Sequence, residues 1–116
     1  MNRHPRQHDE KHLAFIRQLP CIVCQDNTSV ESCHIRMSDG RIAKQNPGIG
    51  AKPDDKYTLP LCGKHHREQH SMNEHEFWFV KYRIDPILTS LAIYSVSGDA
   101  EQAERIIKQS MTVLVR

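Results

Sequence analysis

Residues 61–70 read LCGKHHREQH and place one cysteine and three histidines within ten positions. Thiolate and imidazole are ligands that Zn²⁺ prefers, and the two-residue gap between Cys62 and His65 lets both side chains reach one ion. Cys21 and Cys24 have the same gap farther upstream. Two such pairs predict one tetrahedral zinc site, and the alternative is a set of ordinary buried thiols.

Length and composition fit one small domain. The chain has 116 residues, and a core of this size gains from a metal staple. The formal net charge is +2, which is compatible with a nucleic-acid partner but is weak evidence for one. We therefore expect a single domain over residues 1–116.

The sequence gives no sign of membrane insertion or export. No segment approaches the roughly 20 consecutive apolar residues of a membrane span. The first residues are polar and lack the apolar region of a secretory signal. We expect a cytoplasmic protein, and four cysteines in a reducing compartment favour metal ligands or free thiols over disulfides.

Periodicity and turn residues predict two short strands surrounded by helices. The segment between the strands contains three glycines and two prolines and reads as a long loop over residues 38–56. Strands are expected within residues 30–35 and at 57–61. Helices are expected at residues 7–18, 64–70, about 71–84 and 86–96, followed by a last helix capped by Asp99.

Two histidines remain on the helix over residues 64–70 once His65 binds zinc. His66 and His70 are four residues apart and so lie on one helix face, which suits a second metal ion or a phosphate. Glu68 stands one position too late for the HExxH motif of metalloproteases, so that reading is rejected. The alternative is a surface helix that carries two histidines by chance.

Three further features of the chain can be read in more than one way. His8 and His12 have the same four-residue spacing without neighbouring ligands, and we expect both on the surface. Cys33 and His34 are neighbours on a strand and point to opposite faces. Either Cys33 competes for the zinc, or Cys33 packs inside and His34 faces the two helix histidines, which we prefer. The carboxylates of Asp54 and Asp55 could serve a metal site or only form a turn.

The order of these motifs resembles the HNH endonucleases, which are ββα-metal or His-Me finger nucleases. The stretches CHIR at 33–36, KPDD at 52–55 and LPLCGKHHREQH at 59–70 more closely resemble small phage and prophage HNH proteins. Those proteins are related to the RecA-dependent recombination-enhancing nucleases. The resemblance implies an α+β fold with a ββα-metal core, stapled by zinc over residues 12–80. Residues 81–116 would form a helical extension.

The resemblance also implies roles for individual residues. The histidine that ends the first strand, His34, would be the general base, and His66 and His70 would bind the catalytic divalent ion. The structural zinc would bind Cys21, Cys24, Cys62 and His65. Asp55 would take the place of the asparagine of the HNH motif and could share the catalytic ion, with Asp54 as the alternative.

The implied function is a metal-dependent DNA endonuclease or nickase of weak sequence specificity. The catalytic ion would be Mg²⁺, Mn²⁺, Ni²⁺, Co²⁺ or Zn²⁺. The implied setting is a bacterial or phage-infected cell, with DNA as partner and a recombination or phage protein as a further candidate. The alternative is a zinc-stapled nucleic-acid-binding module without catalysis. Four loop residues are expected to neutralise phosphates, unless they only solvate the loop: Arg36, Arg41, Lys44 and Lys52.

Overall fold

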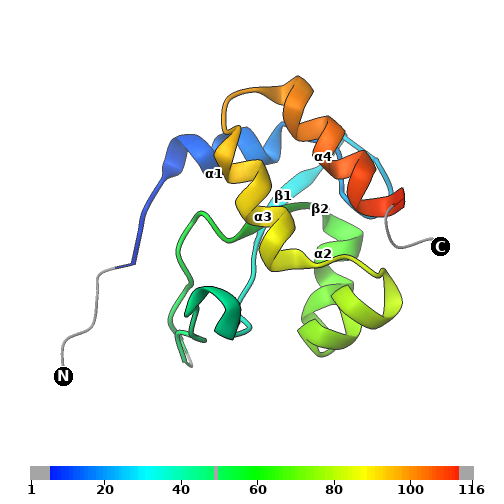
Figure 1. The fold of residues 1–116 in the computed structure, drawn as a ribbon. Coiled ribbons are helices and arrows are strands. Elements are labelled where there is room, and N and C mark those ends of the chain that lie inside the picture. The colour runs from blue at the N-terminus through cyan, green and yellow to red at the C-terminus, as the bar shows by residue number, and fades with distance from the viewer. Residues whose placement is uncertain (1–5, 49, 113–116) are drawn as a thin grey trace.

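The computed structural model describes residues 6–48 and 50–112, apart from the side chains of 111 and 112. The remaining parts of the expected 1–116 domain lie outside the described residues. The elements run in this order: α1 (Glu10–Arg17), β1 (Val30–His34), η1 (Gly40–Ile42), β2 (Thr58–Cys62), α2 (Gly63–His70), η2 (Glu76–Lys81), α3 (Pro86–Ser95) and α4 (Ala100–Thr112), as Figure 1 shows.

The centre of the fold is a two-stranded antiparallel sheet followed directly by a helix. Val30 of β1 pairs with Cys62 of β2, and His34 pairs with Thr58 at the other end. The helix α2 begins at Gly63, the residue after β2. The structure confirms the predicted α+β class, with further helices around this unit.

Capping residues set the beginnings of three helices. Asp9 accepts a hydrogen bond from the backbone of α1, so this helix begins at Glu10. The expected start was residue 7. The Asp85 side chain caps α3, and Pro86 occupies its first turn, as predicted. The side chain of Asp99 accepts from the Gln102 backbone at 3.2 Å and caps α4, also as predicted.

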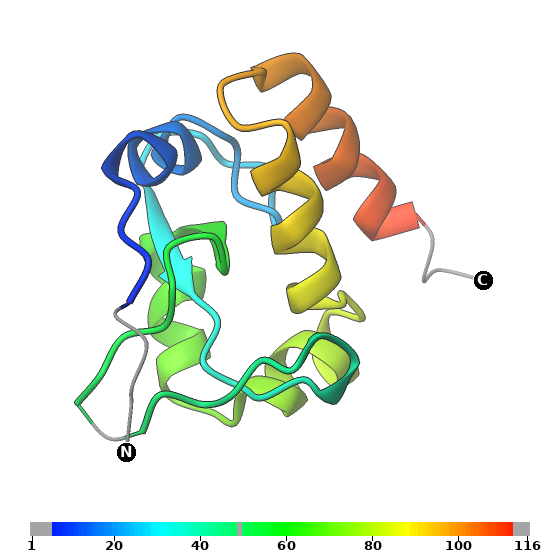
Figure 2. The same cartoon turned by 60° about the vertical axis from the view of Figure 1, so that its left-hand side comes forward.

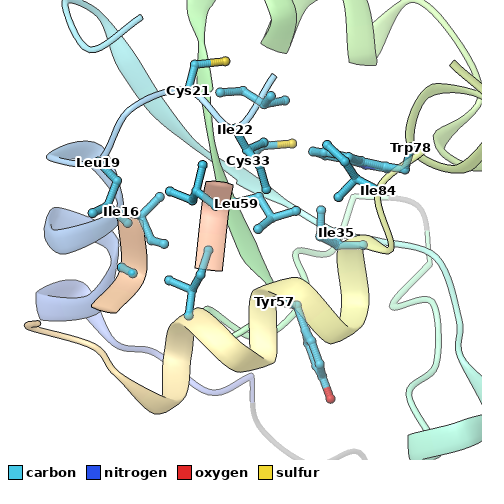
Figure 3. Packing of buried hydrophobic residues seen from close by; sticks show 14 of the residues in the cluster. Ile16, Leu19, Cys21, Ile22, Cys33, Ile35, Tyr57, Leu59, Trp78 and Ile84 are labelled. Atoms are coloured by element: carbon cyan, nitrogen blue, oxygen red, sulfur yellow. The ribbon is translucent and has the colours of Figure 1, made fainter. Parts of the chain in front are cut away.

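One apolar core joins α1, η2, α3 and α4 to the sheet. Figure 3 shows side chains of α1, both strands and the segment around Trp78 converging on it. Phe77 and Trp78 are fully buried in the short π-helix η2 and pack in this core. Figure 2 shows α3 and α4 lying side by side, and both contribute buried residues to the same core.

His12 is buried, so the expectation that it lies on the surface was wrong. Its ring packs edge-on against Tyr94 of α3, with centroids 4.9 Å apart, and its Nδ1 lies 2.7 Å from the Ser97 hydroxyl. The ring is covered because α1 packs beneath the junction of α3 and α4, a contact that local spacing does not reveal.

No helix in the described part of the chain is long and apolar enough to span a membrane.

Candidate functional site

The four predicted zinc ligands come together at one end of the sheet. Their ligand atoms all lie within 4.8 Å of one another. The Cys24 and Cys62 sulfurs are 3.8 Å apart, and His65 Nδ1 is 3.1 Å from Cys62 Sγ and 3.9 Å from Cys21 Sγ. Two sulfurs on a tetrahedral zinc lie about 3.8 Å apart, because each Zn–S bond is about 2.3 Å. The cluster can therefore hold a zinc ion.

Three separate elements supply these ligands. Cys21 and Cys24 lie on the turn after α1, in which Gln25 adopts a left-handed conformation with φ of 67°. Cys62 ends β2, and His65 lies in the first turn of α2. Burial raises the pKa of Cys62, but hydrogen bonds from the backbone of His65 and neighbouring groups outweigh it and lower the pKa overall. A thiolate is thus favoured at the ligand that joins strand and helix.

Cys33 takes no part in the zinc cluster. Its side chain is buried, with Sγ 3.8 Å from Gln69 Oε1 of α2. Burial, followed by the charges of Glu74 and Glu31, raises the pKa of this thiol well above its usual range. The preferred expectation, that Cys33 packs inside, agrees with this placement.

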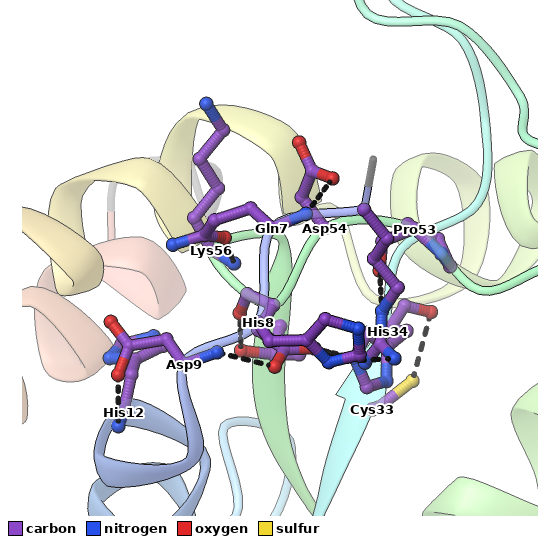
Figure 4. A network of polar contacts seen from close by, with 12 residues as sticks. Gln7, His8, Asp9, His12, Cys33, His34, Pro53, Asp54 and Lys56 are labelled. Carbon is purple, nitrogen blue, oxygen red and sulfur yellow. Dashed lines mark hydrogen bonds and ion pairs between the residues drawn. The ribbon is translucent and has the colours of Figure 1, made fainter. Parts of the chain in front are cut away.

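His34 forms a hydrogen-bonded group with a carboxylate from the turn before β2. His34 Nε2 lies 2.9 Å from Asp55 Oδ1. Arg6 Nη2 bonds to the same oxygen and lies 3.4 Å from His34 Nε2. Figure 4 shows His34 beside this network, which also includes the N-terminal segment around Asp9. We call His34, Asp55 and Arg6 the His34 group.

Asp55 is suited to orienting His34 rather than to binding a metal. Its second oxygen, Oδ2, accepts from the Asp9 backbone at 2.8 Å, so both oxygens are engaged. Burial raises the pKa of Asp55, but the bonds from Asp9, His34 and Arg6 outweigh it and lower the pKa overall. Asp54 instead accepts from the Gln7 backbone at 2.8 Å. Of the two aspartates, only Asp55 contacts His34 within the described residues.

The surroundings of the His34 ring favour its neutral form. Burial is the main effect that lowers its pKa, the Arg6 and Lys52 cations act in the same direction, and Asp55 opposes them. An ionised carboxylate can only accept a hydrogen bond, so Nε2 carries the proton that Asp55 receives. Nδ1 is then the nitrogen that can accept a proton from water near neutral pH.

His66 and His70 form a second imidazole cluster on α2. Their Nε2 atoms are 3.1 Å apart, and Glu31 Oε1 lies 2.7 Å from His66 Nδ1. Two nitrogens on one tetrahedral ion would lie about 3.3 Å apart, because each metal–nitrogen bond is about 2.0–2.1 Å. A carboxylate on the other ring nitrogen is the usual support for a ligating histidine. The pair therefore fits one divalent ion, with Glu31 fixing the tautomer of His66.

The expectation that His34 faces the two α2 histidines is not met. Glu31 and Cys33 are two residues apart on β1 and so lie on one face of the strand. Both contact α2: Glu31 bonds to His66, and Cys33 to Gln69. By the same alternation His34 points to the opposite face, where it bonds to Asp55 and lies beside Arg6. Within the described residues, no hydrogen bond or ion pair joins the His34 group to the α2 histidines.

Three of the four basic residues expected at phosphates bond to other groups of the protein. Arg36 donates to the Gly48 and Ala51 carbonyls at 2.5 Å each. Arg41 pairs with Asp39 and Asp85. Lys44 is 6% exposed, and its Nζ donates to the Met37 carbonyl at 2.7 Å. Lys52 is exposed, and its charge lowers the pKa of His34. Of the four residues, it is the one best placed to contact a phosphate near His34.

Sequence reasoning did not find Arg6 or Glu31. Glu31 lies two residues before Cys33 on the strand face toward α2, and that alternation is a signal that could have placed it near His66. Arg6 carries no such signal, because it reaches Asp55 across 49 residues of chain.

One comparison with known proteins gives a match. A family model described as "Protein of unknown function (DUF968)" matches residues 2–90. No curated protein and no solved structure matches the chain. The matched range contains the zinc cluster, the His34 group and the α2 histidines.

Proposed function

We propose that this chain, which belongs to the DUF968 family, is a metal-dependent DNA endonuclease or nickase that hydrolyses phosphodiester bonds. The observation that carries the proposal is the 2.9 Å bond between the half-buried His34 and the buried carboxylate of Asp55. The resemblance of the surrounding motifs to HNH endonucleases supports it. The zinc cluster stabilises the unit that presents His34.

His34 would act as the general base. Phosphodiester hydrolysis requires a water that loses a proton as it attacks phosphorus. Asp55 holds Nε2 and so directs Nδ1 away from itself, where it can take that proton. The carboxylate also stabilises the imidazolium that forms, as in other aspartate–histidine pairs.

His66 and His70 would hold the catalytic divalent ion, with Glu31 behind His66. Such an ion stabilises charge on the scissile phosphate and on the departing oxygen. Imidazole ligands suit Ni²⁺, Co²⁺ and Zn²⁺ better than Mg²⁺, which prefers oxygen. We therefore expect Ni²⁺, Co²⁺ and Zn²⁺ to support cleavage better than Mg²⁺ or Mn²⁺.

The substrate would be held mainly through its backbone. Lys52 is exposed beside His34 and would contact a phosphate, which gives affinity without sequence preference. We place the activity in the cytoplasm of a bacterial or phage-infected cell, where a recombination or phage protein is the candidate that would direct it to its DNA.

A second candidate function is a zinc-stapled nucleic-acid-binding module without catalysis. The observation that favours it is the separation of the His34 group and the α2 histidines on the two faces of β1. Glu31 and His34 are three residues apart, which is about 10 Å along a strand. A nuclease would need its substrate to reach both the His34 group on one face of β1 and the α2 histidines on the other.

A plasmid nicking assay distinguishes the two functions. Supercoiled DNA is incubated with Mg²⁺, Mn²⁺, Ni²⁺ or Co²⁺ and the wild-type chain, His34→Ala or the exposed control His75→Ala. We expect His34→Ala to lower the rate about 10²- to 10⁴-fold with unchanged zinc content, and His75→Ala to match the wild type. DNA binding by a wild-type chain that nicks with none of these metals would favour the module.

A further inference from the structure

Residues 6–9, which we call the N-terminal strap, lie against the turn that precedes β2. Figure 4 shows the strap residues Gln7 and Asp9 beside Asp54 and His34. Besides the bonds of Arg6, four hydrogen bonds join strap and turn: Gln7 N to Asp54 Oδ1 at 2.8 Å, Asp55 N to Gln7 O at 3.1 Å, Lys56 N to Gln7 Oε1 at 3.0 Å and Asp9 N to Asp55 Oδ2 at 2.8 Å. These bonds hold the strap against the turn that contacts His34.

The guanidinium of Arg6 is committed to protein partners. Its Nε donates to the Pro53 carbonyl at 2.9 Å, and its Nη1 lies 3.3 Å from His8 Nδ1. Its Nη2 donates to Asp55 and lies 3.4 Å from His34. These contacts use all three nitrogens of a planar donor group, which fixes its plane. Such a group is suited to holding Asp55 rather than to capturing a phosphate.

Asp55 depends on these donors because its side chain is only 2% exposed. A buried carboxylate is costly unless it is paired and hydrogen-bonded. The donors that surround it are Arg6, His34 and the Asp9 backbone. Without Arg6, Asp55 would keep the Asp9 backbone on Oδ2, but Oδ1 would have only His34 as a partner, so the acceptor of the His34 ring would be held less firmly.

We propose that Arg6 is a positioning residue, which through Asp55 fixes the orientation and tautomer of His34. The kinetic consequence rests on the proposed nuclease function, whereas the effect on the His34 ring does not. The charged groups that face His34 are Asp55, Arg6 and Lys52. Of these, only Arg6 contacts both the ring and its acceptor.

The first test reads the His34 ring directly, without activity. Ring nitrogen shifts of His34 are measured by NMR in the wild type, Arg6→Gln, Arg6→Lys and the control Arg17→Gln, whose arginine pairs with Glu10 on the surface of α1. We expect the Nε2–H tautomer in the wild type and in Arg17→Gln, and a tautomer mixture in Arg6→Gln. Arg6→Lys keeps the charge but not the planar guanidinium with its several donors. Its share of the Nε2–H tautomer should therefore lie between those of the wild type and Arg6→Gln.

The second test measures nicking kinetics and chemical rescue. Because a misplaced catalytic group costs up to about 10²-fold, we expect Arg6→Gln to lower kcat roughly 10- to 100-fold with little change in KM. Added methylguanidinium should restore part of the activity of Arg6→Ala. A purely structural role of the strap would give no such rescue.

The outcomes separate the two proposals. If the wild type does not nick DNA but Arg6→Gln still mixes the tautomers, the positioning role stands and the nuclease function fails. If the His34 tautomer stays unchanged in Arg6→Gln, the positioning role is overturned, whether or not the chain nicks DNA. A raised KM with unchanged kcat would also overturn it, since Arg6 would then bind substrate. Should Arg6→Gln fail to fold, the NMR spectrum of Arg6→Lys decides.

Discussion

His34 ends β1, and Asp55 lies on the turn before β2, yet their side chains meet at 2.9 Å in a group whose carboxylate is almost fully buried. The pairing of His34 with Thr58 at this end of the sheet brings the turn beside the ring. This relationship gives the molecule an oriented imidazole, the group that would act as general base in the proposed hydrolysis.

Replacement of Asp55 by asparagine tests that relationship. Asp55→Asn keeps the shape but removes the charge that accepts from His34 and Arg6. We expect loss of about 1–3 kcal/mol in the free energy of unfolding, because a buried charge-assisted network is broken. Nicking should fall at least tenfold. The matched control, Asp54→Asn, should retain activity, and equal effects of the two variants on nicking would contradict the assignment. Urea unfolding and plasmid nicking provide the measurements.

Zinc removal should unfold the protein. The cluster joins the turn after α1, the end of β2 and the start of α2, and a structural zinc contributes directly to folding. We expect a strong chelator or Cys62→Ser to abolish the cooperative thermal transition, seen by circular dichroism. Cys33→Ala should keep one zinc per chain in metal analysis, since Cys33 packs on Gln69 instead. Loss of zinc from Cys33→Ala would contradict the assigned ligand set.

A second ion should bind to the α2 histidines of the zinc-loaded protein. Calorimetric titration with Ni²⁺ or Mn²⁺ should show one site that disappears in His66→Ala. Glu31→Gln should weaken the affinity about 10- to 100-fold, as expected for a residue that supports a ligand. His8→Ala serves as the control, since His8 contacts Arg6 rather than α2. Unchanged binding in His66→Ala would place the ion elsewhere.

Acid should destabilise the protein partly through His12. Burial lowers the pKa of His12, although the charges of Asp9 and Asp55 oppose it. The unfolded chain therefore binds a proton at higher pH than the folded one, so the free energy of unfolding falls as pH drops below about 6.5 and through the folded pKa. His12→Gln should flatten this dependence between pH 7.5 and 5.5 in urea unfolding, whereas His75→Gln should leave it unchanged. Equal slopes in all three proteins would refute this account.

The spacing of cysteines and histidines by itself predicted the cluster that can hold a zinc ion. A two-residue gap on a turn restricts where two side chains can reach, so Cys21, Cys24, Cys62 and His65 could be paired without a structure. The helix caps at Asp85 and Asp99 were equally local, because a cap depends on residues two or three positions away. The two strands and the helix after them followed from the same short-range patterns.

Only the tertiary structure decided which face each side chain occupies. Alternation along β1 separates Cys33 from His34, but packing of α2 determined that Cys33 faces the helix and His34 faces the strap. The burial of His12 and the contacts of Arg6 depend on segments distant in the chain. Such contacts arise from how helices pack on the sheet, and no local spacing encodes them.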